Sequence, residues 1–169
     1  MWRRPLVSNS DLKQSEVSVL RDDINNALKD AMKSGDKLRV STLRLVNSAL
    51  KNADIEARGQ GKSALADEDV LSLLQKMIKQ RQESVELYEK GGRAELAEQE
   101  RGEIKIISGY LPAQMSEAEV KAAIAGIVKD TGAAGMKDMG KVMAALKESY
   151  AGKMDFGKAS PVVKALLTG

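Results

Sequence analysis

Apolar residues recur at every third or fourth position through most of this chain, which is the spacing of one buried face of an α-helix. In the first such segment Val17, Leu20 and Ile24 follow this spacing, and Ser34-Gly35 ends it as a helix C-terminus commonly ends. The same rule predicts helices over residues 15–34, 37–58, 68–90 with Asp67 as its cap, 95–111, 117–130 and 138–151. A shorter helix is predicted after residue 155.

Two segments interrupt the helical pattern. Residues 1–14 are polar, carry Pro5 and show no period, so we expect a disordered or peripheral leader. Pro112 ends the fourth helix, because a proline disfavours helical geometry in the residue before it. We therefore predict an all-α chain, with an N-terminal bundle of long helices over residues 15–111 and a small C-terminal domain of three helices over residues 112–169.

Composition agrees with helix and narrows the chemistry. Only 3% of the residues are aromatic and there are three prolines, while alanine, leucine, lysine and glutamate are frequent. The chain has no cysteine and no histidine, which excludes disulfides, thiolate nucleophiles and imidazole ligands or bases. With no cysteine, no apolar run long enough to span a bilayer and no secretory signal at the start, we expect a cytoplasmic protein.

Short matches to catalytic motifs carry little weight. Ser34–Lys37 fits S-x-x-K and Asp130–Gly132 fits an aspartic-protease triplet, but both fall at predicted helix ends and lack partner motifs. Glu100 and Glu103 lie one helical turn apart, yet an exposed acidic pair at that spacing is usually only solvated. We predict no catalytic residue, no cofactor and no metal site.

A pattern of aspartate, apolar residue, glycine, lysine and small residue occurs twice, at Asp138–Val142 and at Asp155–Ala159. An aspartate there can accept hydrogen bonds from the first helical turn, so both copies are predicted helix starts. Glycine leaves the backbone bare and lysine adds a positive charge, which together suit a phosphate. If both copies serve this purpose, we expect the two helix starts to share one open surface. Alternatively, the two helices cross glycine against glycine and the lysines are solvated. The second helix either continues from Asp155 or restarts at Ser160-Pro161.

Basic residues also recur along the second predicted helix, every seven positions: Lys37, Arg44, Lys51 and Arg58. On an α-helix this spacing makes one nearly straight stripe. The stripe is either the solvated face of an amphipathic helix or a contact for a phosphate backbone. The few aromatic residues are scattered, which disfavours stacking on single-stranded bases but leaves recognition of a folded RNA by shape.

Several segments together resemble the YqeY family. They are Thr42–Leu45, Lys51–Glu56, Met77–Ser84, Gly92–Ala97 and Tyr110–Gln114. The C-terminal portion is also similar to the tail of the B subunit of the amidotransferase that converts misacylated glutamyl- or aspartyl-tRNA. Gly140–Met143, Gly152-Lys153 and Asp155 stand at characteristic positions of that tail.

The resemblance implies a helical bundle joined to a small domain that is similar to a tRNA-contacting module. It also implies an association with carbon–nitrogen ligase activity that uses glutamine as amide donor. The ATP-binding cradle and the serine-lysine machinery of that enzyme lie outside the tail, however, and nothing here matches them.

Two hypotheses follow from these patterns. The leading one is an accessory protein, not catalytic alone, that binds tRNA or a tRNA-bearing complex. The rival is a helical module that docks on an amidotransferase or another translation component without touching RNA. The residues assigned to nucleic-acid contact are Gly140, Lys141, Lys153, Gly157 and Lys158, with Arg44, Lys51 and Arg58 as a second contact.

Overall fold

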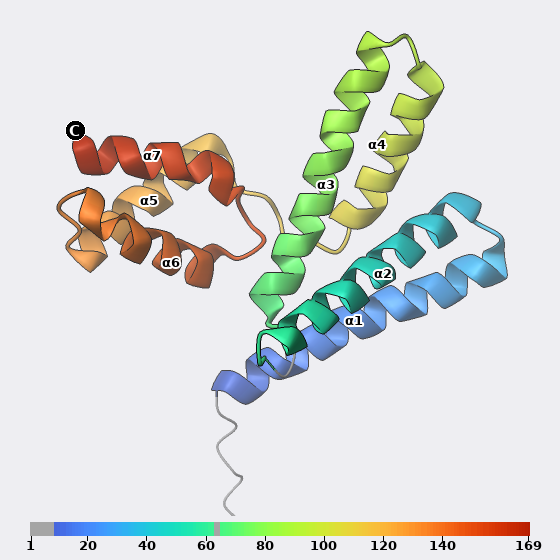
Figure 1. Cartoon of the computed structure of the whole chain (residues 1–169), viewed down its shortest axis with the longest axis horizontal. Helices are drawn as coiled ribbons and strands as arrows, with labels where there is room; N and C mark the ends of the chain where they lie inside the picture. Colours follow the sequence, from blue (N-terminus) through green and yellow to red (C-terminus); the bar gives the residue numbers. More distant parts are fainter. Residues whose placement is uncertain (1–8, 63–64) are drawn as a thin grey trace, which may run out of the picture. The chain divides into compact units, whose positions relative to one another are not determined.

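A computed structural model describes residues 9–62 and 65–169 of the chain (Figure 1). Every regular element in this described part is helical, so the prediction of an all-α chain is confirmed. The elements are α1 (Asn9–Ser34), α2 (Lys37–Gly59), α3 (Asp67–Lys90), α4 (Ala94–Ser108), α5 (Glu117–Thr131), the short 3₁₀ helix η1 (Met136–Asp138), α6 (Met139–Tyr150) and α7 (Phe156–Thr168). The chain divides into a larger unit, Met1–Tyr110, and a smaller unit, Leu111–Gly169.

The first helix is longer than its apolar pattern predicts. It begins at Asn9, so residues 9–14, which we expected in a leader, are helical. These residues include no proline or glycine, and nothing in their backbones opposes an extension of the helix. Residues 1–8, the remainder of the expected leader, lie outside the described residues.

In the larger unit α1 and α2 form a helical hairpin (Figure 1). Gly35 provides the turn with a positive φ of 73°, and the Asp36 carboxylate accepts a hydrogen bond from the Arg39 backbone N–H at 3.1 Å. Arg21 donates two hydrogen bonds, of 2.9 and 2.8 Å, to the Asp54 carboxylate and so joins the two helices. These hydrogen bonds, more than the charge alone, lower the pKa of Asp54.

A second hairpin joins α3 and α4, and its ion pair is more deeply buried. Arg81 Nε donates to Glu103 Oε2 at 2.8 Å, and the two side chains are only 13% and 9% exposed. A further Arg81 N–H bonds the Met77 carbonyl oxygen at 3.1 Å. Since each charge has both a counter-charge and hydrogen bonds, the pair is well satisfied despite its burial.

Helix α4 also packs closely on α2. At Gly102 a Cβ atom would lie 2.8 Å from Leu38 Cδ2, so the helix backbone itself forms this contact. A glycine in a helix interior costs roughly 1 kcal/mol relative to alanine. Here it leaves room for the end of the Leu38 side chain between the two hairpins.

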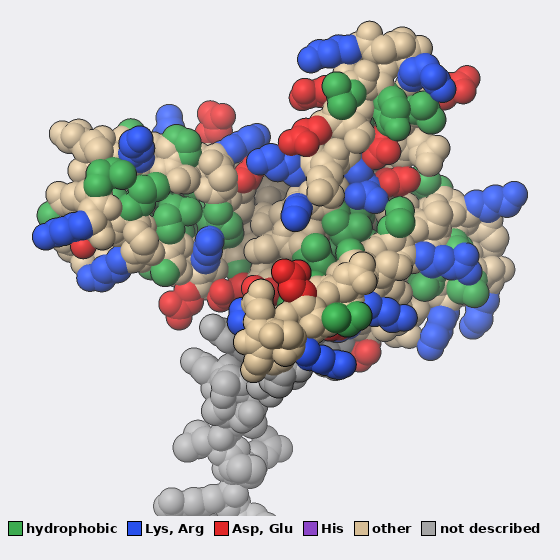
Figure 2. Space-filling model, viewed as in Figure 1, with side chains coloured by type: hydrophobic (Ala, Val, Ile, Leu, Met, Phe, Trp, Pro, Cys, Tyr) green, Lys and Arg blue, Asp and Glu red, His purple; other side chains and the backbone are tan. Residues whose placement is uncertain are grey.

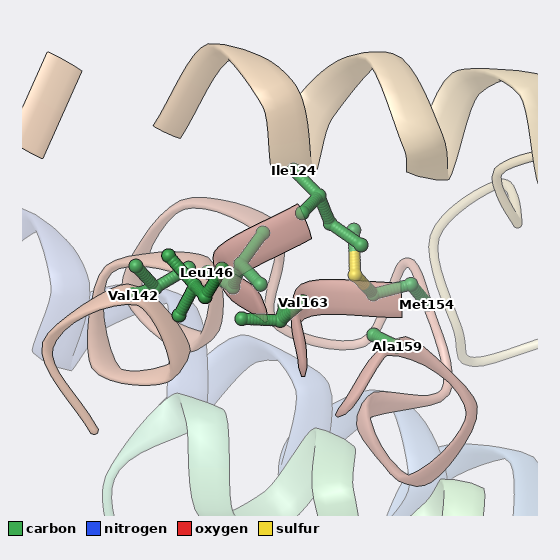
Figure 3. Close-up of a cluster of buried hydrophobic side chains, with 7 residues drawn as sticks. Ile124, Val142, Leu146, Met154, Ala159 and Val163 are labelled. Atoms are coloured by element: carbon green, nitrogen blue, oxygen red, sulfur yellow. The ribbon is translucent and has the colours of Figure 1, made fainter. Parts of the chain in front are cut away.

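The smaller unit packs α5, α6 and α7 around buried Ile124, Val142, Leu146 and Val163 (Figure 3). Helix α5 begins with the predicted capping box. The Glu119 N–H donates to Ser116 Oγ at 3.2 Å, and the Ser116 N–H donates to Glu119 Oε2 at 2.8 Å. Gly132, with φ of 65°, ends the helix.

The burial of the Arg81–Glu103 pair predicts how a substitution at Glu103 changes the stability of the fold. Glu103→Ala leaves the guanidinium buried without its counter-charge, so the free energy of unfolding should fall by about 3 kcal/mol. Urea denaturation followed by circular dichroism measures it. The control is Glu98→Ala, which removes an exposed partner of Arg101 and should cost no more than about 0.5 kcal/mol. Equal losses in the two variants would contradict the assignment.

Candidate nucleic-acid interface

The Asp155 carboxylate caps α7, as predicted. Its Oδ1 accepts hydrogen bonds from the backbone N–H groups of Gly157, at 2.8 Å, and of Lys158, at 3.4 Å. The same bonds occupy the amides that a phosphate would need. An external anion would therefore have to displace a carboxylate that the chain itself holds in place.

Asp138 does not cap α6, and this part of the prediction is wrong. Its Oδ2 accepts a hydrogen bond from the Ala134 N–H at 3.0 Å, on the preceding loop. The helix grows directly out of η1, where the Met139 N–H already bonds the Met136 carbonyl oxygen. The preceding helical turn, and not the Asp138 side chain, therefore supplies the acceptor for the first N–H group of α6.

The two helix starts do not share a surface, although the sequence pattern led us to expect it. Lys141 Nζ donates to the carbonyl oxygen of Thr131, the last residue of α5, at 3.2 Å. The turn before α7 is bonded beyond the other end of α5, where the Met115 N–H donates to the Lys153 carbonyl oxygen at 2.9 Å. Because α5 is about 22 Å long, the two starts lie at opposite ends of the smaller unit. Figure 1 shows α6 and α7 running in opposite directions.

The alternative in which the helices cross glycine against glycine is also wrong at Gly140. A Cβ atom there would meet nothing within 4 Å, so no helix packs on this residue. Gly140 and Gly157 are both exposed. Their bare backbones remain open to approach, but from separate directions.

Helix α7 is continuous through Pro161, which decides between the two predicted forms of this segment. The proline removes one backbone hydrogen bond. Ala159, Val163 and Leu167 lie on one side of the same helix and are buried in the core. We attribute the continuity to this buried face, whose packing outweighs the lost bond.

Four of the five basic residues of α2, spaced seven positions apart, form what we call the α2 row: Lys37, Arg44, Lys51 and Arg58. All four are exposed, and none makes an ion pair or side-chain hydrogen bond with the described residues. Three other arginines of this unit are paired: Arg21 with Asp54, Arg81 with Glu103, and Arg101 with Glu98 and Glu89. Figure 2 shows Lys and Arg side chains spaced along the α1–α2 hairpin.

Two apolar side chains beside the α2 row were not singled out by the sequence pattern. Leu45 is 49% exposed and Ile55 is 66% exposed. They lie away from the buried positions Leu43, Val46 and Leu50 on the helix circumference. Their positions along the helix indicate this exposure in the sequence, because both residues fall outside the stripe of buried positions on α2.

Comparison with known proteins bears on the whole chain. A sequence model of the family described as Yqey-like protein matches residues 21–167. The chain belongs to this family. The resemblance noted from its short motifs is thereby confirmed.

Relatives of this YqeY-like chain carry the name "Altered inheritance of mitochondria protein 41, mitochondrial". The one from Lachancea thermotolerans is 37% identical over 64% of this chain and 57% of its own length. The Pyrenophora tritici-repentis protein is 31% identical over 87% and 85%. A Saccharomyces cerevisiae protein is 33% identical over 64% and 60%. The chain thus spans little more than half the length of the first and third of these relatives.

The expectation of a cytoplasmic protein is contradicted by these names, since all three relatives are called mitochondrial. Absence of cysteine was weak evidence for a compartment, because it fits any reducing environment. Within the described residues no helix is both long and apolar enough to cross a membrane.

In a chain without histidine or cysteine, the acidic residues are the remaining side chains that could hold a metal ion. No group of three or more histidine, cysteine, aspartate or glutamate residues that could hold a metal ion occurs among the described residues. Glu103 is committed to Arg81. Burial raises the pKa of Glu100, and the Glu103 charge raises it further, while Arg81 opposes both effects. Glu103 therefore pairs with Arg81, whereas Glu100 is affected by the Arg81 charge only as a cause that opposes the rise of its pKa.

The raised pKa of Glu100 makes a prediction about stability and pH. A folded-state pKa above the unfolded value stabilises the fold at low pH, and this contribution is lost as pH rises through the folded pKa. Glu100→Gln should therefore unfold at higher urea concentration than wild type at pH 7, and the difference should shrink at pH 3.5. A difference independent of pH would show that ionisation of Glu100 is not its cause.

Proposed function

We propose that this YqeY-like chain is an accessory protein, without catalysis of its own, that binds tRNA or a complex carrying tRNA. The observation that carries the proposal is the α2 row, four exposed cations on one helix. None of them forms an ion pair with a described carboxylate, although the charge of Arg58 contributes to the lowered pKa of Asp54. The similarity of the C-terminal portion to the tRNA-contacting tail of the amidotransferase B subunit supports it. We further propose that residues 15–111 and 112–169 act as two helical domains, a bundle and a three-helix domain.

Unpaired surface cations favour a polyanion for a simple electrostatic reason. Each Lys or Arg that neutralises a phosphate releases a condensed counterion, and this release drives binding independently of base sequence. A cation already held by a carboxylate, such as Arg21 or Arg81, would first have to give up that partner. The members of the α2 row form no ion pair with a described carboxylate that RNA binding would have to break.

The smaller unit offers secondary contacts at separate points. Lys153 and Lys158 are exposed near the start of α7, beside the exposed Gly157. Lys141, beside Gly140, lies at the other end of the unit and uses one N–H on Thr131, which leaves two ammonium hydrogens for other acceptors. One short RNA segment would meet one end only, so these contacts are additions to the α2 row.

The rival function has one observation in its favour. Leu45 and Ile55 place exposed apolar surface on the same helix as the cations. A protein partner, such as an amidotransferase or another translation component, would bury that surface. In that case a stoichiometric protein partner should remain in a pull-down after nuclease treatment, and RNA should not compete for it.

Binding of tRNA is the direct test. Fluorescence anisotropy with labelled tRNA should show saturable binding whose logarithm falls with the logarithm of salt concentration with a slope near about −3, as expected for about four phosphates. The triple variant Arg44→Glu, Lys51→Glu, Arg58→Glu should weaken binding by at least about thirtyfold at low salt and flatten the slope by about two, because three phosphate contacts are lost.

The matched control carries the same change of charge on another helix. Lys76, Lys79 and Lys90 are exposed on α3, and their replacement by glutamate should change tRNA affinity less than about threefold beyond the general effect of net charge. Circular dichroism confirms that both variants are folded. Equal losses in the two triple variants, or no saturable binding by wild type, would remove the proposal.

A further inference from the structure

The α2 row has a regular geometry along its helix. Its members are seven residues apart on an unbroken α-helix, Lys37–Gly59, so successive side chains start about 10 Å apart. From the first cation to the last the row is about 31 Å long. That is comparable to about one turn of a nucleic-acid double helix.

The helix backbone that carries the α2 row is held in place by packing and by hydrogen bonds to α1. Leu43, Val46 and Leu50 are buried on the opposite side of α2, and Arg21 ties the helix to α1 through Asp54. Its polar and apolar sides are therefore held in one orientation. A rigid row of charges gains most from a partner whose own charges are held at constant intervals, because neither side then loses much conformational freedom on binding.

Single-stranded RNA is a poorer match for this surface. Proteins that hold single strands combine basic grooves with aromatic side chains on which the bases stack. Wherever the structure describes side chains, the aromatic residues Tyr88, Tyr110, Tyr150 and Phe156 are at least partly buried, and none is exposed. The α2 row itself contains only cations, so it can contact a backbone but cannot stack bases.

From these observations we infer that the α2 row binds the sugar–phosphate backbone of a double-helical RNA stem about one turn long, without reading its sequence. A double helix presents phosphates at constant intervals and hides its bases, which is the case in which shape and backbone dominate recognition. The inference rests on the proposed RNA-binding function and names the element of the RNA that is contacted. Lys37, which the sequence placed in the stripe but not among the contact residues, is then a fourth contact.

The decisive experiment alters the order of the cations and keeps their number. The exchange Lys51→Asn with Asn52→Lys moves one ammonium group about 100° around the helix, and Arg44→Leu with Leu45→Arg does the same for one guanidinium. All four positions are exposed, and both composition and net charge are unchanged. The double exchange therefore separates the position of the charges from their sum.

The probes are a blunt RNA duplex of twelve base pairs, one of its single strands, and tRNA, measured by fluorescence anisotropy at the same salt concentration. We expect wild type to bind the duplex at least about tenfold more tightly than the single strand. The double exchange should weaken duplex binding by about tenfold or more, whereas the α3 control variant should retain it. Duplexes of unrelated sequence should bind within about threefold of one another.

Each other outcome has a defined meaning. If tRNA binds and the duplex does not, or if duplex and single strand bind equally, the inference is overturned and the proposed function survives. An unchanged affinity in the double exchange overturns it as well, because total charge would then be sufficient. If neither tRNA nor duplex binds, both proposals fail, and the α2 face is left to a protein partner.

Discussion

The pairing of arginines with carboxylates decides which positive charges of the larger unit are available to a partner. Arg21 and Arg81 are bonded to Asp54 and Glu103, and these pairs join α1 to α2 and α3 to α4. These charges stabilise the fold and are not available to a ligand, because loss of the carboxylate would leave a partly buried guanidinium unpaired. No member of the α2 row forms an ion pair with a described carboxylate, and this difference is the basis of the proposed interface.

The smaller unit shows the same principle in its backbone. The N–H groups of a first helical turn require acceptors, and in this unit the chain supplies them itself. Asp155 bonds the first turn of α7, and at the start of α6 the Met139 N–H bonds the Met136 carbonyl oxygen of η1. The repeated sequence pattern thus predicted two helix starts correctly, and at α7 the Asp155 carboxylate occupies two of the amides that a phosphate would need. What remains for a ligand at these ends is the ammonium groups and the exposed glycines.

Much of the architecture could be predicted from the chain because it depends on local chemistry. The 3.6-residue period marks the helices, Ser116 and Glu119 define a capping box, and Asp36 and Asp155 precede helices that they cap. The start of α1 could not be placed, because polar residues without an apolar period are compatible with either coil or helix. The course of α7 also stayed open, because local propensity at Pro161 opposes the packing of Ala159 and Val163.

The sequence by itself determined the all-α class, the family, most helix limits and the spacing of the cations along α2, since all of these depend on residues near one another in the chain. Only the tertiary structure decided which of the cations are paired, and that the two glycine-lysine segments lie at opposite ends of the smaller unit. It also decided that Lys141 bonds the end of α5. The reason is physical: an ion pair or a shared surface depends on which helix faces which, and residues 22 or 33 positions apart, such as Arg81 and Glu103 or Arg21 and Asp54, meet only after folding.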